Sequence, residues 1–207
     1  MSNLPAPRTV EVVGGAPAPE PARPRVLLVG TALASGASFM VFAGMVGIYL
    51  SVRSSVIAGG DSWLPAGAEL PLTPANMGLF TLLMAAVTMQ WAVDAMGKSD
   101  RPHAYLALGT TLLLGVSHVV MMAYYYTQMN LVLNGESSTQ AVLIYSITGL
   151  HLAMVVAALV FISLMAFRAL GGQFTGRDRE GVASAAMFWH VTIAVYTVVW
   201  YSIFIVK

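Results

Sequence analysis

Five long stretches without Asp, Glu, Lys or Arg follow one another along this chain of 207 residues. A helix needs about 20 apolar residues to cross the roughly 30 Å hydrocarbon layer of a bilayer, and each stretch is longer than that. None shows the alternation of apolar and polar positions that is typical of strands in a membrane barrel. The pattern therefore predicts an all-α integral membrane protein with five transmembrane helices, at about 27–52, 75–96, 104–129, 140–168 and 183–205.

The first 25 residues differ in composition from the rest of the chain. They hold six of the ten prolines, together with Ala, Gly and scattered charges, and no periodic apolar face. Such a segment cannot bury enough surface to offset its ordering entropy. We expect a disordered tail over 1–25 and a membrane domain over 26–207. The apolar run from Val26 to Ala34 also fits a signal-peptide core, but its continuation to Val52 favours an uncleaved first helix.

Lys and Arg are distributed unevenly over the loops between the predicted helices. Eight basic residues fall on one side of the membrane, whereas only Arg53 and Lys207 fall on the other. Loops rich in Lys and Arg stay in the cytoplasm, so the bias predicts an N-terminus inside and a C-terminus outside. The eight residues are Arg8, Arg23, Arg25, Lys98, Arg101, Arg168, Arg177 and Arg179.

The composition narrows the possible functions. Hydrophobic residues make up 57% of the chain and charged residues only 9%, far below the quarter that is usual in soluble proteins. The absence of cysteine excludes disulfides, thiolate metal sites and iron–sulfur clusters. The net charge of +1 gives no sign of a nucleic-acid partner.

Few polar or ionisable residues fall inside the predicted spans. Three of the four histidines, His118, His151 and His190, lie inside the spans. No carboxylate lies in mid-span, which argues against an ion-coupled transporter. His118 and His151 would lie at similar depth on antiparallel helices. They could therefore hold a b-type haem between them, or each could donate a hydrogen bond between helices. Small residues in the first span, among them Gly36 and Gly44, predict close contact with another helix.

Thr148–His151 in the fourth predicted helix and Phe188–Val191 in the fifth are two of several short segments that, in their order and spacing, resemble subunit III of haem-copper cytochrome c oxidases in its five-helix bacterial form. Thr148-Gly-Leu-His151 is similar to the Thr-Gly-Phe-His segment of that family, and Phe188-Trp-His-Val191 is similar to its Tyr-Trp-His-Phe segment. The resemblance runs from about Val26 to Lys207. The other segments are Phe39–Gly44, Trp63–Gly67, Leu70–Pro71 with Asn76, Gly115, Ala123–Tyr124 with Tyr126, and Phe167–Arg168 with Phe174–Thr175.

The resemblance implies a non-redox subunit of a respiratory terminal oxidase in the bacterial plasma membrane. It implies no catalytic residue and no metal in this chain, with haem and copper held by subunits I and II, the partner subunits. A V-shaped bundle is also implied, in which the first two helices form one arm and the last three form the other, with structural phospholipid in the cleft. Its lipid-binding residues would be Arg168, His151, Trp189, His190 and Trp63.

The chain departs from the family pattern at the membrane carboxylates. Ser38, Tyr125 and Ile193 stand where relatives have acids, so the roles of those acids do not transfer. The electron donor and membership of a larger supercomplex stay open. Alternatives are a subunit III-like component of a quinol oxidase or nitric oxide reductase, a small b-type membrane cytochrome, and a small permease or assembly protein.

Overall fold

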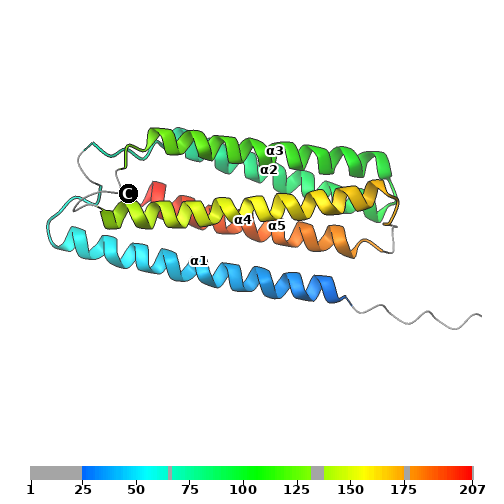
Figure 1. Ribbon diagram of the computed structural model, residues 1–207, viewed down its shortest axis with the longest axis horizontal. Coiled ribbons are helices and arrows are strands. Elements are labelled where there is room, and N and C mark those ends of the chain that lie inside the picture. Colours follow the sequence, from blue (N-terminus) through cyan, green and yellow to red (C-terminus); the bar gives the residue numbers. More distant parts are fainter. Residues whose placement is uncertain (1–24, 65–66, 132–137, 175–177, 207) are drawn as a thin grey trace, which may run out of the picture.

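The computed structural model describes residues 25–64, 67–131, 138–174 and 178–206, and these form a helical bundle (Figure 1). All five long helices are long and apolar enough to cross a membrane, which confirms the predicted number of spans. The expected disordered tail falls on residues 1–24, outside the described residues. The helices are α1 (Val26–Ala58), α2 (Leu72–Gly97), α3 (Arg101–Gln128), α4 (Ser138–Leu170) and α5 (Glu180–Trp200), which continues as a π-helical segment, Tyr201–Ile205.

The helices run antiparallel, with α4 and α5 between α1 on one side and the α2–α3 pair on the other (Figure 1). In its most apolar stretch α5 is 56% buried, whereas α1 is only 17% buried. The expectation that the first two helices pair as one arm of a V is wrong, because α2 packs along α3 while α1 packs on α5 and α4. Helix α5 is therefore the central element of the fold.

The helix ends extend past the predicted spans where polar side chains find partners inside the helix. Helix α1 continues from the predicted residue 52 to Ala58, and the hydroxyls of Ser54 and Ser55 donate to the Ser51 carbonyl at 2.8 and 3.0 Å. Helix α2 begins at Leu72, with Pro74 in its first turn, where a missing N–H leaves no hydrogen bond unmade. Polar residues near the membrane surface therefore do not end these helices.

Asp100 caps the start of α3. Its carboxylate accepts hydrogen bonds from the His103 backbone N–H at 3.4 Å and from His103 Nδ1 at 2.8 Å. The hydrogen bond from the His103 side chain holds the pKa of Asp100 below its usual value. The cap is therefore a carboxylate over a wide pH range, which suits the positive end of a helix dipole.

The first helix is tied to the last one at the end where both begin. The backbone N–H of Leu28, in the first turn of α1, donates to Glu180 Oε1 at the start of α5, at 3.0 Å. The carboxylate satisfies one of the unpaired N–H groups of that turn. Elsewhere α1 is loosely covered, and a Cβ added at Gly36, Gly44 or Gly47 would meet no atom within 4 Å. The predicted close helix contact at these glycines is thus absent within the described chain.

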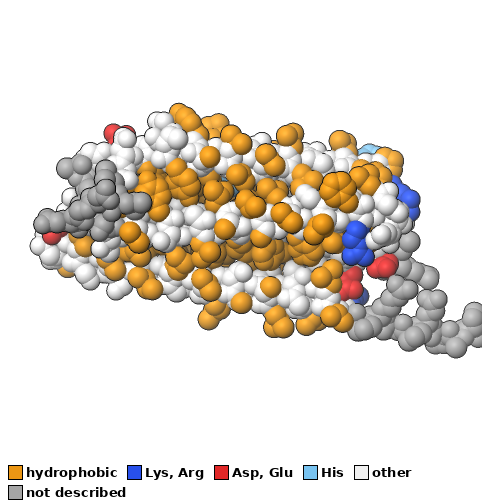
Figure 2. Space-filling view, viewed as in Figure 1, with side chains coloured by type: hydrophobic (Ala, Val, Ile, Leu, Met, Phe, Trp, Pro, Cys, Tyr) orange, Lys and Arg blue, Asp and Glu red, His pale blue; other side chains and the backbone are white. Residues whose placement is uncertain are grey.

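Hydrophobic side chains cover the length of the bundle on the face seen in Figure 2, and the charged side chains lie at its two ends. Exposed Thr and Ser hydroxyls inside the spans donate to carbonyls of their own helix, as Ser117 does to Leu113 at 2.8 Å. In lipid, polar groups must find partners within the protein. The surface is that of a multi-pass membrane protein.

Candidate functional site in the bundle core

A buried cluster of polar rings joins three helices at the centre of the bundle. It consists of His118 from α3, His151 from α4 and Tyr196 from α5, with exposed fractions of 0%, 1% and 1%. The Tyr196 ring lies 4.9 Å from each imidazole, measured between centroids, and the two imidazoles are 6.0 Å apart. The prediction that His118 and His151 lie at similar depth is confirmed by this contact.

Each ring of the cluster is hydrogen-bonded to a backbone carbonyl of another helix. His118 Nδ1 lies 3.1 Å from the Gly78 carbonyl of α2, and His151 Nε2 lies 3.1 Å from the Thr192 carbonyl of α5. Since a carbonyl oxygen only accepts, these ring nitrogens carry the protons. The Tyr196 hydroxyl donates to the Ala75 carbonyl of α2 at 3.2 Å. The cluster thus links α3 to α2, α4 to α5, and α5 to α2.

Gly78 allows the approach of the cluster to α2. A Cβ at this position would lie 3.1 Å from the Tyr196 hydroxyl and 3.3 Å from His118 Nδ1. Both distances are shorter than an ordinary van der Waals contact, so a larger residue would push the two rings away from the α2 carbonyls. The glycine in α2 and the rings in α3 and α5 form one packing unit.

The imidazoles of His118 and His151 are not arranged to hold a haem between them. His151 has its Nε2 committed to the Thr192 carbonyl, and Tyr196 fills the space beside both imidazoles, with Phe42 edge-on to His151 at 6.2 Å. A macrocycle between the histidines would have to displace this tyrosine. Across the described residues, no group of three or more His, Asp or Glu side chains could hold a metal ion.

Comparison with known proteins then decides the family. Residues 24–207 match the family "Cytochrome c oxidase subunit III". The chain belongs to the cytochrome c oxidase subunit III family. Its members are subunits of an oxidase complex, so the resemblance carried by the sequence motifs is confirmed.

Bacterial relatives match over most of their length. A cytochrome c oxidase subunit 3 of Corynebacterium diphtheriae is 28% identical over 186 residues, which cover 88% of this chain and 87% of the relative. A probable cytochrome c oxidase subunit 3 of Mycobacterium bovis is 30% identical over 186 residues, covering 86% and 89%. The cytochrome c oxidase subunit 3 of Sus scrofa is 29% identical over 150 residues, and this chain spans only 56% of that longer relative.

Three of the five residues expected to bind lipid are buried in the interior of the helical bundle. His151 belongs to the core cluster, Trp189 is 0% exposed and Trp63 is 5% exposed. The Trp189 indole donates to the Ala85 carbonyl of α2 at 3.3 Å, and the Trp63 indole donates to the Tyr49 hydroxyl at 3.0 Å. The bundle therefore encloses all three side chains, and each indole N–H has an acceptor inside it.

The other two residues of that set lie nearer the surface. Arg168 is exposed in the last turn of α4, where its Nε donates to Gln173 Oε1 at 2.8 Å and its guanidinium carbon lies 5.4 Å from the Phe174 ring centroid. His190 is half-buried, and its Nδ1 lies 2.6 Å from the carbonyl of Ala186 in its own helix. Of the five residues, Arg168 is the one with a charged and exposed side chain at a helix end.

The three positions that the family resemblance associates with acids are occupied by groups without charge. The Ser38 hydroxyl donates to the Ala34 carbonyl at 2.9 Å, and Ile193 is buried. Tyr125 is fully buried against Phe204, at 5.3 Å between centroids, and its hydroxyl has no partner among the described residues. Tyr196 was not predicted from the sequence, although its position in mid-span, at the depth of both histidines, was an available signal.

Proposed function

We propose that this chain is the non-redox third subunit of a haem-copper terminal oxidase in a bacterial plasma membrane, where it packs against subunit I and stabilises it. The haem and copper would reside in subunits I and II, which pass electrons from cytochrome c to oxygen. The observation that carries the proposal is the family match over residues 24–207. The core supports it, since each ring of the central cluster is engaged in a link between helices and not arranged around a reaction centre.

Purification through an affinity tag on this chain tests the proposal. The tagged chain, extracted from membranes in mild detergent, should bring down larger subunits that carry haem, and the complex should reduce oxygen with reduced cytochrome c. Oxidation of a quinol by the complex, with no reaction with cytochrome c, would favour the quinol oxidase alternative. A Soret band in the isolated single chain would contradict the proposal and support the b-type cytochrome.

The proposed topology has the N-terminus in the cytoplasm and the C-terminus outside. The antiparallel bundle gathers Lys98, Arg101, Arg168 and Arg179 at the end where α1 begins, and this supports the positive-inside assignment (Figure 1). Because the chain has no cysteine, labelling of single introduced cysteines can measure this topology. We expect a membrane-impermeant maleimide to label Ser62→Cys in intact spheroplasts and Ser99→Cys only after permeabilisation. The reverse pattern would contradict the topology.

The proposed lipid contact is at Arg168, whose side chain is exposed in the last turn of α4. A guanidinium at the membrane boundary can bind a phosphate through two hydrogen bonds. We expect Arg168→Ala to lower the occupancy of a retained phospholipid without removing haem from the complex, as measured by native mass spectrometry. Lys98→Ala removes a cation at the same end of the bundle and is the matched control. Unchanged lipid occupancy in Arg168→Ala would reduce Arg168 to a topology determinant.

A further inference from the structure

A groove on the outside of the bundle lies between α3 and α4, away from the central cluster. It has a volume of about 220 Å³ and is lined chiefly by apolar side chains, among them Leu112, Phe167 and Leu170. Phe167 is 71% exposed and Leu170 is 62% exposed, so the groove opens on the membrane-facing surface. None of the five residues expected to bind lipid lines it.

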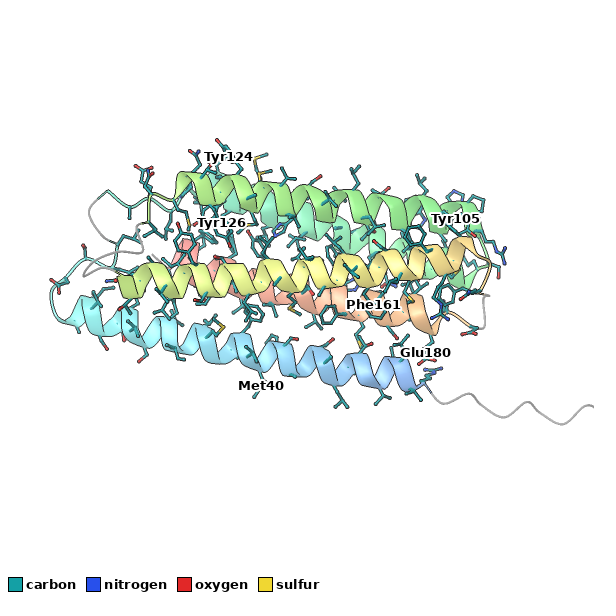
Figure 3. All side chains as sticks on the ribbon, in the orientation of Figure 1. Met40, Tyr105, Tyr124, Tyr126, Phe161 and Glu180 are labelled. Carbon is teal, nitrogen blue, oxygen red and sulfur yellow. The ribbon has the colours of Figure 1, made fainter. Side chains whose placement is uncertain are left out.

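A glycine creates the groove and a tyrosine closes one of its ends. Gly109 of α3 lines the groove, and a Cβ at this position would meet no atom within 4 Å. Tyr105, one turn earlier, reaches from α3 to the end of α4, where its hydroxyl donates to the Ala169 carbonyl at 3.0 Å (Figure 3). Ser163 is the other polar side chain of the wall, and the Tyr105 hydroxyl is hydrogen-bonded to the backbone, so the groove presents a mainly hydrocarbon surface to its occupant.

A cation lies at the closed end of the groove. Arg101 is four residues before Tyr105 and eight before Gly109, so it falls on the same face of α3. One guanidinium nitrogen of Arg101 lies 3.8 Å from the position that a Cβ of Gly172 would take, in the turn after α4. The guanidinium therefore bridges the ends of the two helices that form the groove, where hydrocarbon gives way to headgroups. An apolar groove that ends at a cation is complementary to an anionic amphiphile.

We propose that this groove binds one acyl chain of a retained anionic phospholipid, with the lipid phosphate at Arg101. Guanidinium and phosphate form strong, charge-assisted hydrogen bonds, and the apolar wall gives the acyl chain a surface to pack against, since packing contacts drive association inside a membrane. The site deepens the lipid-holding role proposed above and rests on it. It is separate from Arg168, whose side chain is engaged with Gln173 and Phe174.

Filling the groove tests the proposal. Gly109→Leu places a side chain in open space, so the helix can accommodate it, and the new side chain occupies the position of the acyl chain. Gly44→Leu makes the same change at an equally open glycine of α1 and is the matched control. In native mass spectra of the detergent-extracted complex, we expect Gly109→Leu to retain one phospholipid fewer than the wild type and Gly44→Leu to retain the full number. Equal lipid numbers in all three proteins would overturn the proposal.

Two further measurements separate the groove from its alternatives. Arg101→Gln should weaken binding of added phosphatidylglycerol about fivefold, the effect of one basic residue at a membrane surface. Phosphatidylcholine carries the same phosphate beside a choline cation, so the wild type should bind it more weakly than phosphatidylglycerol. Unchanged binding of phosphatidylglycerol by Arg101→Gln would overturn the role of Arg101. A photo-crosslinker on Gly109→Cys should yield a lipid adduct, and an adduct with another polypeptide would overturn the lipid as occupant. Co-purified haem is scored separately, so a failed oxidase assignment is distinguishable from an empty groove.

Discussion

Replacing Trp189 with alanine is expected to lower the free energy of unfolding by about 3–5 kcal/mol, the range for deletion of a buried aromatic side chain. Trp189 is completely enclosed, and its indole N–H donates to the Ala85 carbonyl across the α5–α2 contact. Its ring edge also lies 3.0 Å from the position that a Cβ of Gly115 in α3 would take. The substitution therefore leaves a cavity where three helices meet.

Trp91→Ala is the matched control for Trp189→Ala. Trp91 is 39% exposed on α2, and its ring contacts His103 near the helix end, at 6.0 Å between centroids. We expect it to lose well under 1 kcal/mol, as is usual for surface substitutions. Unfolding of both variants in mixed detergent micelles, followed by far-UV circular dichroism, measures the difference. Similar losses for the two tryptophans would contradict the assignment of Trp189 to the core.

The five spans could be predicted because a charge-free run of sufficient length has few alternatives to a helix in lipid. The pairing of those helices could not. Outward-facing and inward-facing residues are both apolar in a membrane protein, so the sequence carries little sign of which face is buried. Glycine illustrates the ambiguity: Gly36 and Gly44 face open space on α1, whereas Gly115 of α3 lies against Leu159 and Trp189. Composition alone does not separate the two cases.

The candidate site was predicted in part. His118 and His151 were identified because an ionisable residue in mid-span is costly and must have a partner. Their partners were not predicted, since the acceptors are the backbone carbonyls of Gly78 and Thr192, which every sequence supplies. Trp189 was expected to bind lipid because of the family resemblance. The acceptor of its indole N–H, the Ala85 carbonyl, depends on the packing of α5 on α2, which the sequence does not reveal.

Changes to the core histidines are expected to lower stability and to leave the chemistry of the oxidase intact. His118→Gln and His151→Gln each lose ring contacts with Tyr196 and weaken a link to another helix, at a cost of about 1–3 kcal/mol each. His190→Gln is the control, because His190 is half-buried and its hydrogen bond stays within α5. The measurements are unfolding in detergent, initial oxygen-reduction turnover and proton pumping in reconstituted vesicles.

Comparing the loss of stability with the loss of proton pumping in these variants distinguishes a packing role of the cluster from a proton-relay role. If the cluster links helices, the two core variants unfold more easily than His190→Gln, and all three assembled complexes begin turnover and pumping at the rate of the wild type. Faster loss of activity during turnover is compatible with that role, since a loosened bundle protects subunit I less well. A proton relay would need a row of titratable groups, yet this chain has no carboxylate at Ser38, Tyr125 or Ile193, the positions that the resemblance associates with acids. Immediate loss of pumping in an assembled His118→Gln or His151→Gln complex would therefore overturn the structural role proposed for this subunit.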